Sequence, residues 1–255
     1  MSESNRDMKL QRSLHKPRWG RIVLKLSGEA FGGDGTSKET IDGVIVRQLA
    51  EEIISALDLG VDVAVVIGGG NIWRGMHGAG AGMDRAQADY MGMLATVINA
   101  LALQDTLEQL GQPARVMTAL HMEQIAEPYI RRRALRHLEK GRVVILAAGL
   151  GAPFFTTDTP AALRAAELSA GAVVKGTHGG VDGVYTADPK LDPSATKLDK
   201  VSYMDVLNQG LGVMDPTSIT FCMDNQLPIV VYDALTEGNL RRVLLEEKRV
   251  GTLVS

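Results

Sequence analysis

The sequence predicts an α/β fold in which a mainly parallel sheet is covered by helices on both faces. Short apolar runs typical of buried strands recur along the chain, and amphipathic helical patterns stand between most of them. This alternation indicates parallel strands joined by crossover helices. With 255 residues, 45% of them hydrophobic and 22% charged, the chain has the length and composition of one large folded domain.

Seven apolar runs are predicted to be strands. The first reads Ile-Val-Leu-Lys-Leu, and most of the later runs are rich in Val and Ile, which favour buried strands. In chain order the predicted strands cover residues 22–26, 61–67, 114–117, 142–147, 172–175, 228–231 and 252–254.

The helices are predicted from apolar residues that recur three or four positions apart and from the stop signals behind them. Gly60 follows such a stripe in residues 41–59, and Gly111 and Pro113 follow a second, longer one in residues 84–110. Further helices are expected at residues 123–139, 160–170, 203–208, 217–225 and 239–247.

Charge and cysteine content exclude several function classes. The net charge is −3 and no basic block dominates the body of the chain, so neither nucleic acid nor a membrane is indicated as partner. The single cysteine, Cys222, cannot form an internal disulfide and has the apolar neighbours of a buried side chain. Residues 1–18 are charged and carry no apolar run, so we expect a flexible tail, a single domain over residues 19–255 and a cytoplasmic location.

The residues that follow the first two strands indicate phosphate chemistry, because ligands of parallel sheets bind at the carboxyl ends of the strands. Lys25 lies in an otherwise apolar run, so its ammonium needs an anion, either a phosphate or a carboxylate, unless it reaches water. Gly68, Gly69 and Gly70 can form a nest of backbone amides for an anion, and Arg74 can add a forked contact. A tight turn alone needs only one or two glycines, so we expect a phosphate cradle.

The segment after residues 142–147 offers groups for both a base and a phosphate. It holds two glycines, the aromatic pair Phe154 and Phe155, and hydroxyl groups beside Asp158 where a helix is predicted to begin. Capping of that helix would explain one hydroxyl group or Asp158, but not the aromatic pair.

The long loop at residues 176–200 is the third candidate region, since loops of this length in compact domains are usually functional or mobile. Tyr185 could stack on an adenine, and Thr177 and Asp188 could hold ribose or base edges, although turn formation explains each of them individually. Neither G-x-x-x-x-G-K-[ST] nor G-x-G-x-x-G after a strand is present, which argues against a P-loop kinase and a nicotinamide dehydrogenase. The glycines of residues 75–82 indicate a mobile connection.

Together these segments resemble the bacterial uridylate kinases of the amino-acid kinase superfamily, from about residue 21 to residue 254. The runs Met-Gly-Met-Leu-Ala-Thr and Pro-Phe-Phe-Thr-Thr-Asp are specific to this branch. The matching positions are residues 25–29, 66–71, 74–75, 89, 91–96, 153–158 and 181–189.

The resemblance implies a three-layer α/β/α sandwich, phosphoryl transfer from ATP to UMP with Mg²⁺ held mainly through phosphates, and a homohexamer that responds to GTP and UTP. The ATP contacts that it implies are Lys25, Leu26, Ser27, Gly28, Gly70, Arg74, Thr177, Tyr185 and Asp188. The UMP contacts that it implies are Gly69, Asp89, Leu150, Gly151, Ala152, Pro153, Phe154, Phe155, Thr156 and Thr157.

A phosphate nucleophile is already largely deprotonated near neutral pH, so catalysis should rest on positioning and on charge neutralisation. We assign Lys25, Arg74 and the amides of residues 68–70 to charge neutralisation, and Asp158 to orienting Lys25 or the water shell of the metal. The sequence leaves Lys175 and Lys190 open as a second cation. No cluster of protein ligands for a metal is visible in the sequence.

The chain departs from the pattern of that family in its long loop and its acceptor segment. The loop is two residues longer, around Gly179 and Gly180, and Leu150 stands where relatives often have a polar residue. Arg115 and Arg142 are the candidates for an effector site. Two alternatives stay open, a kinase of the same superfamily that acts on a carboxylate or carbamate, and a non-catalytic assembly that binds nucleotides or oxyanions.

Overall fold

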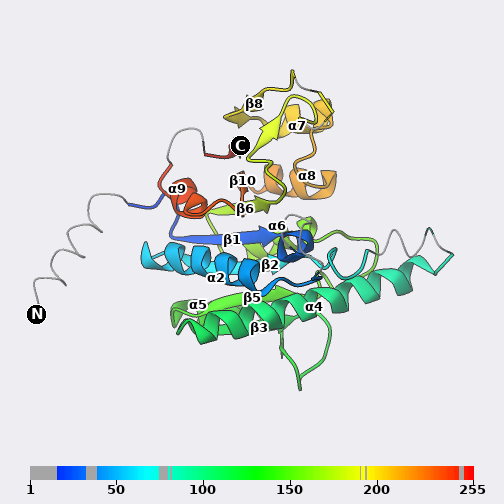
Figure 1. The fold of residues 1–255 in the computed structure, drawn as a ribbon, viewed down its shortest axis with the longest axis vertical. Coiled ribbons are helices and arrows are strands. Elements are labelled where there is room, and N and C mark those ends of the chain that lie inside the picture. Colours follow the sequence, from blue (N-terminus) through cyan, green and yellow to red (C-terminus); the bar gives the residue numbers. More distant parts are fainter. Residues whose placement is uncertain are drawn as a thin grey trace, which may run out of the picture.

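A nine-stranded sheet forms the centre of the protein in the computed structural model, which describes residues 16–32, 39–74, 80, 82–189, 191–192, 194–246 and 250–255 (Figure 1). Its strands are β1 (Arg21–Leu26), β2 (Asp62–Ile67), β3 (Ala114–Thr118), β4 (Glu127–Pro128), β5 (Val143–Ala147), β6 (Ala172–Thr177), β9 (Lys200–Val201), β10 (Ile229–Asp233) and β11 (Thr252–Val254). The strand order is β4-β3-β5-β2-β1-β6-β10-β11-β9, and every pair in it is parallel except β10 with β11. The predicted mainly parallel sheet is confirmed.

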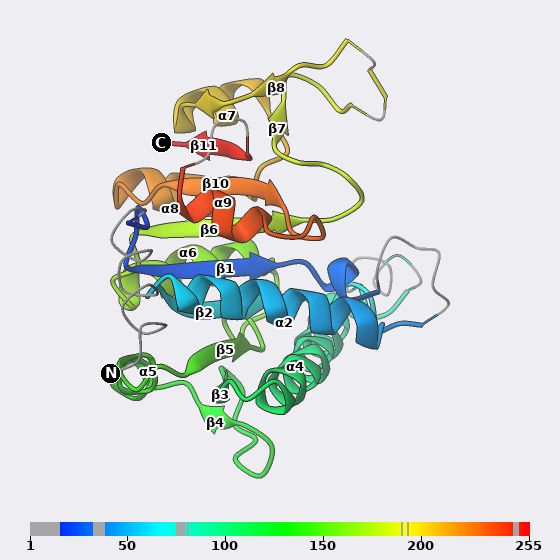
Figure 2. The same cartoon turned by 60° about the vertical axis from the view of Figure 1, so that its left-hand side comes forward.

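Helices cover both faces of this sheet, which confirms the three-layer α/β/α sandwich (Figure 2). They are η1 (Gly28–Gly32), α2 (Gly43–Asp58), α4 (Arg85–Gln109), α5 (Arg131–Glu139), α6 (Asp158–Glu167), α7 (Tyr203–Gln209), α8 (Pro216–Asp224) and α9 (Asn239–Leu244). Residues of α2, α4 and α9 pack in one apolar core, and residues of α5, α6, α7 and α8 pack in the core on the opposite face.

Side chains alternate between the two faces of the sheet along the central strands, and this alternation decides which of them point toward α6. In β1, Leu24 and Leu26 belong to the core under α2 and α4, whereas Val23 belongs to the core under α6. Since successive side chains of a strand point to opposite faces, Lys25 lies on the α6 side of the sheet. In β6, Val173 packs on that same side, and Lys175 therefore shares a face with Lys25.

The seven predicted strands all occur, with their ends shifted by no more than two residues. The predicted helix at residues 123–139 is wrong in its first half, because α5 begins only at Arg131 and Glu127–Pro128 pair with β3 as β4. Proline lacks an amide hydrogen and restrains the residue before it, which favours an extended edge strand here. The long loop contains the hairpin of β7 (Val184–Tyr185) and β8 (Lys197–Leu198), which the sequence pattern did not indicate.

Some predictions concern residues outside the described part. The residues concerned are the tail up to residue 15, most of the glycine-rich residues 75–82, and Lys190.

Cys222 is fully buried in the core under α8, as predicted. Within the described ranges, no helix combines the length and the apolar character that crossing a membrane would need.

Candidate active site

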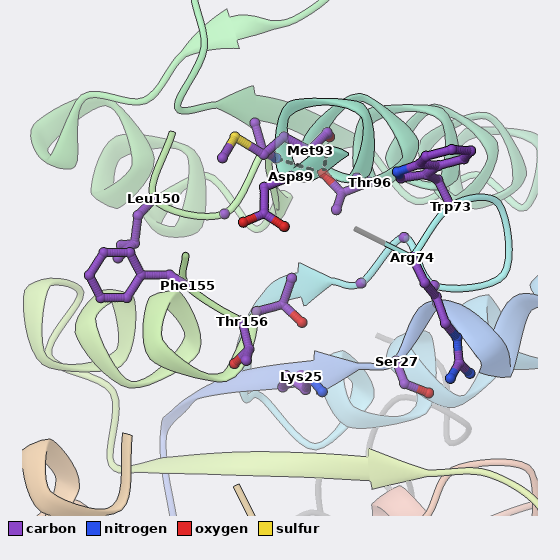
Figure 3. A pocket seen from close by; sticks show the side chains of 18 of the residues that line it. Lys25, Ser27, Trp73, Arg74, Asp89, Met93, Thr96, Leu150, Phe155 and Thr156 are labelled. Atoms are coloured by element: carbon purple, nitrogen blue, oxygen red, sulfur yellow. Dashed lines mark hydrogen bonds between the residues drawn. The ribbon is translucent and has the colours of Figure 1, made fainter. Parts of the chain in front are cut away.

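The carboxyl ends of β1, β2 and β5 surround a cavity of about 520 Å³ (Figure 3). The predicted site residues that line it are Lys25, Ser27, Gly28, Gly69, Gly70, Arg74, Asp89, Leu150, Ala152, Phe155, Thr156 and Thr157. Leu150 and Phe155 lie at one end, Trp73 and Arg74 lie at the other, and the Asp89 carboxylate points into the space between them. The cavity therefore has an apolar end and a charged end.

Two lysines from neighbouring strands share one carboxylate beneath this cavity. Lys25 and Lys175 are register partners in β1 and β6, so their ammonium groups project side by side. Asp158 at the start of α6 lies between them, with Oδ1 2.8 Å from Lys25 Nζ and Oδ2 3.5 Å from Lys175 Nζ. Lys175 also donates a hydrogen bond to the carbonyl of Val213. Asp158 is thus the anionic partner that we expected for Lys25 in its otherwise apolar strand.

This lysine-aspartate-lysine group is almost completely buried, with Lys25 7% and Asp158 8% exposed. Burial raises the pKa of Asp158, but the charges of Lys25 and then Lys175 outweigh it and hold the pKa below its usual value. Burial lowers the pKa of Lys175, the nearby charge of Lys25 lowers it further, and Asp158 offsets only part of this effect. The group carries one net positive charge when all three side chains are ionised.

Thr156 and Asp215 hold Asp158 in place. Thr156 Oγ1 accepts the Asp158 amide hydrogen at 3.1 Å and donates its own hydrogen to Asp215 Oδ2 at 2.5 Å. Asp215 also caps α8 by accepting the Ser218 amide at 2.8 Å. Thr157, at the N-cap position of α6, makes no capping bond with its side chain, so helix capping does not account for this residue.

Asp215 was missed by the sequence analysis. Its position before Pro216 signals a helix start, but its contact with Thr156 depends on how α6 and α8 pack together. Its charge also acts on Lys175, raising the pKa of that lysine.

The glycines at the strand ends allow two loops to approach more closely than side chains would permit. A Cβ atom on Gly28 would lie 2.4 Å from the Gly70 nitrogen, and one on Gly69 would lie 2.8 Å from the carbonyl oxygen of Gly92. Asn99 fixes the loop after β2 by donating to the Gly68 carbonyl at 2.9 Å. Gly28 and Gly69 are therefore required by packing, and the use of their amides for an anion stays a prediction.

The remaining charged side chains of the cavity are engaged in ion pairs. Arg74 contacts Glu29 at 2.5 Å, and Arg85 Nε lies 2.9 Å from Asp89. Asp89 also accepts the Phe154 amide hydrogen at 2.8 Å, which ties α4 to the segment before α6. Asp89 is thus fixed in orientation before any ligand arrives.

The predicted adenine-side residues do not line the cavity, since Thr177 ends β6 and Tyr185 and Asp188 lie in the loop that follows it. Tyr185 donates to Asp182 Oδ1 at 2.6 Å, and Lys197 donates to Oδ2 of the same carboxylate at 2.7 Å. Thr177 Oγ1 lies 2.9 Å from the Tyr232 carbonyl and also contacts the Val181 carbonyl. Asp188 lies in the same loop, where its backbone carbonyl accepts the amide hydrogens of Leu191 and Asp192. The other predicted residues that do not line the cavity are Leu26, Gly151, Pro153 and Phe154.

The proposed effector residues belong to a separate network on the β3 and β5 side. Arg115 contacts Glu108 at 3.0 Å, and Arg142 Nη1 lies 3.1 Å from His137 Nδ1. Among the described residues, no group of three or more His, Cys, Asp or Glu side chains is arranged to hold a metal ion.

Comparison with known proteins gives a consistent result. Residues 20–233 match the Amino acid kinase family. A solved structure of UMP kinase from Bacillus anthracis is similar with a TM-score of 0.88 and 42% sequence identity, and the match covers 93% of this chain and 96% of that one. UMP kinase from Ureaplasma parvum is similar with a TM-score of 0.85 and 38% identity, covering 93% and 99% of the two chains.

Proposed function

This chain belongs to the amino acid kinase family, and we propose that it is a nucleoside monophosphate kinase that transfers a phosphoryl group from ATP to UMP. The similar structures are UMP kinases by name, and the likeness extends over nearly their whole length. The proposal treats residues 19–255 as a single catalytic domain.

The observation that carries the proposal is the buried group of Lys25, Asp158 and Lys175 beside a cavity lined by glycines. Three ionisable side chains with one net positive charge suit a site where negative charge gathers on a phosphoryl group. Burying two ammonium groups beside one carboxylate leaves one positive charge unpaired, which costs free energy unless an anionic ligand binds nearby. Lys25 lines the cavity, whereas Asp158 reaches the ligand only through Lys25.

The shape of the cavity supports assigning its two ends to two parts of UMP. We place the base near Leu150 and Phe155, the ribose at Asp89, and the phosphate toward Lys25 and the amides of Gly69 and Gly70. The Asp89 carboxylate can accept hydrogen bonds from ribose hydroxyl groups, since it is already oriented by Arg85 and Phe154. ATP would then approach from the side of Ser27 and the loop after β6.

Lys25 neutralises the charge that develops on the transferred group, while Asp158 keeps its ammonium directed to the cavity. The residues fit a Mg²⁺ ion that is held mainly by phosphates, because Glu29, Asp89 and Asp158 are all engaged by cations. Asp158 Oδ1 is buried and lies 2.8 Å from Lys25 Nζ, which supports its role in orienting Lys25. When bound, the ion would neutralise phosphate charge.

A panel assay tests the proposal. ADP release is measured with UMP, CMP and glutamate as acceptors, for the wild-type protein, for Lys25→Met and for the exposed control Lys200→Met. We expect UMP to give the fastest release, Lys25→Met to lower kcat about 10²- to 10³-fold, and Lys200→Met to match the wild type. Faster release with glutamate would indicate a carboxylate kinase, and tight UMP binding without release would indicate a non-catalytic assembly.

We propose further that the chain assembles as a homohexamer that responds to GTP and UTP, with Arg115 and Arg142 as effector contacts. An exposed apolar stripe on α4 supports self-association, since Met91, Leu94 and Ile98 are 39–49% exposed at helical spacing. Light scattering of the wild type and of Leu94→Glu tests the assembly, and a monomeric wild type would contradict it. Adding GTP or UTP to the panel assay tests the response.

A further inference from the structure

The loop that follows β6 brings His178 against Ser27 at the end of β1. His178 Nδ1 lies 3.0 Å from Ser27 Oγ, which is the distance of a hydrogen bond between the ring and the hydroxyl group. Ser27 lines the cavity, and His178 contacts it from the side of β6. The pair therefore joins the cavity lining to the end of β6 at Thr177.

The local fold fixes this contact. Leu26 and Gly176 are register partners, and a Cβ atom on Gly176 would lie 2.9 Å from Leu26 Cδ2 and 2.7 Å from Ala234 Cβ, so the strands meet closely here. Gly179 and Gly180 then turn the chain back, both with positive φ, at 70° and 76°. The two glycines of the lengthened loop thus allow His178 to stand beside Ser27.

A bond from Thr177 closes the same loop. The Thr177 hydroxyl group contacts the Val181 carbonyl and lies 2.9 Å from the Tyr232 carbonyl, so its single hydrogen is used on the backbone. Its oxygen can then only accept hydrogen bonds, and it cannot also donate to a phosphate oxygen. Ser27 is in a different situation, because the partner of its hydroxyl group is a ring nitrogen that can either accept or donate.

We propose that His178 is a positioning residue for the phosphoryl donor and acts by setting the direction of the Ser27 hydroxyl hydrogen. When Nδ1 carries a hydrogen, in the imidazolium or in one neutral tautomer, the ring donates to Ser27 Oγ and the serine hydrogen is released for a phosphate oxygen of ATP. When Nδ1 is bare, Ser27 donates to the ring instead and has no hydrogen left for the phosphate. A bound anion therefore selects the form with a hydrogen on Nδ1.

This inference rests on the proposed function, since it takes ATP as the ligand next to Ser27. It also gives the Gly179 and Gly180 segment a role, because these two residues with positive φ turn the chain directly after His178. The competing explanation is that the bond between Ser27 and His178 only fastens the loop to β1. The two explanations differ in which kinetic constant should change.

The experiment is a double-mutant cycle on the full chain. Ser27→Ala, His178→Ala, the double variant and His178→Asn are compared, because the asparagine amide can donate to Ser27 Oγ from nearly the position of Nδ1. The matched control is His121→Ala, whose side chain is exposed and does not line the cavity. The affinity for a non-hydrolysable ATP analogue is measured by calorimetry, and KM is measured for ATP and UMP separately.

We expect His178→Ala to weaken analogue binding and to raise the KM for ATP by about 3- to 10-fold, with less than a twofold change in the KM for UMP. His178→Asn should restore most of the loss, and the double variant should be no worse than Ser27→Ala alone. Additive losses in the cycle, equal changes in both KM values, or a loss confined to the melting temperature would overturn the proposal. If the wild type fails to phosphorylate UMP, the proposed function fails, and the analogue affinities still decide the role of His178.

Discussion

Replacing Asp158 with asparagine removes the carboxylate that lies between Lys25 and Lys175 while keeping nearly the same shape. In the wild type its oxygens lie 2.8 Å and 3.5 Å from the two ammonium nitrogens, and all three side chains are mostly buried. Breaking a buried ion pair by removing one partner costs about 3–5 kcal/mol, because it leaves an uncompensated charge. We expect Asp158→Asn to lower the free energy of unfolding by that amount in urea titrations at neutral pH.

The catalytic effect of Asp158→Asn should exceed its effect on substrate binding. Without the carboxylate, Lys25 is no longer held toward the cavity, so we expect kcat to fall about 10²-fold or more and the KM for UMP to change by less than about threefold. ADP release by a coupled assay gives both constants. A kcat within threefold of the wild type would refute the assigned role of Asp158.

The stability of the Asp158→Asn variant should also depend on pH and on the charge of Lys175. Because the pKa of Lys175 is already lowered in the folded protein, the folded state binds fewer protons than the unfolded state as the pH rises toward the ordinary value of about 10.5. Since Asp158 raises the pKa of Lys175, its removal lowers this pKa further and extends the effect to lower pH. The difference in stability between Asp158→Asn and the wild type should therefore shrink as the pH rises and Lys175 loses its proton. Adding Lys175→Met should recover most of the lost stability but not the lost turnover. A deficit that is independent of pH and unaffected by Lys175→Met would contradict the charge argument.

Three further results are expected. Gly28→Ala should prevent the segments after β1 and β2 from packing closely, since the new Cβ would lie 2.4 Å from the Gly70 nitrogen. The melting temperature and the rate of ADP release should both fall, and a variant with wild-type activity would contradict this expectation. Asp89→Asn should raise the KM for UMP about 10-fold or more through loss of a charged acceptor, with the KM for ATP unchanged in the same assay. Burial, aided by the Asp215 charge, raises the pKa of Cys222 to about 12, so its thiol should resist a disulfide reagent at pH 8 until the protein is unfolded; rapid reaction of the native protein would contradict this.

Periodicity and composition were enough to predict the main strands, because each is a short, mostly apolar run of the kind found in buried strands. The same reasoning required an anion for Lys25, although it could not choose between a phosphate and a carboxylate. The structure shows the carboxylate, Asp158, and adds that the same group also serves Lys175. Burial of Cys222 followed from its apolar neighbours in the same way.

What the sequence could not provide were the contacts that depend on strand order and on helix packing. The pair of Ser27 and His178 spans 151 positions in the chain and exists because β1 and β6 are neighbours in the sheet. The bond from Thr156 to Asp215 depends in the same way on the packing of α6 against α8. Very short strands such as β4 carry too few residues for a periodic pattern, so a helix was predicted in their place.

Transfer of a phosphoryl group from ATP to UMP can be observed by following the γ-phosphoryl group itself. ATP labelled in that group is mixed with UMP, Mg²⁺ and the wild-type protein, and the nucleotides are separated by ion-exchange chromatography. We expect the label to move into UDP, UDP and ADP to form in equal amounts, and Lys25→Met to slow the formation of both. Label released as free phosphate, or ADP formed without UDP, would contradict it.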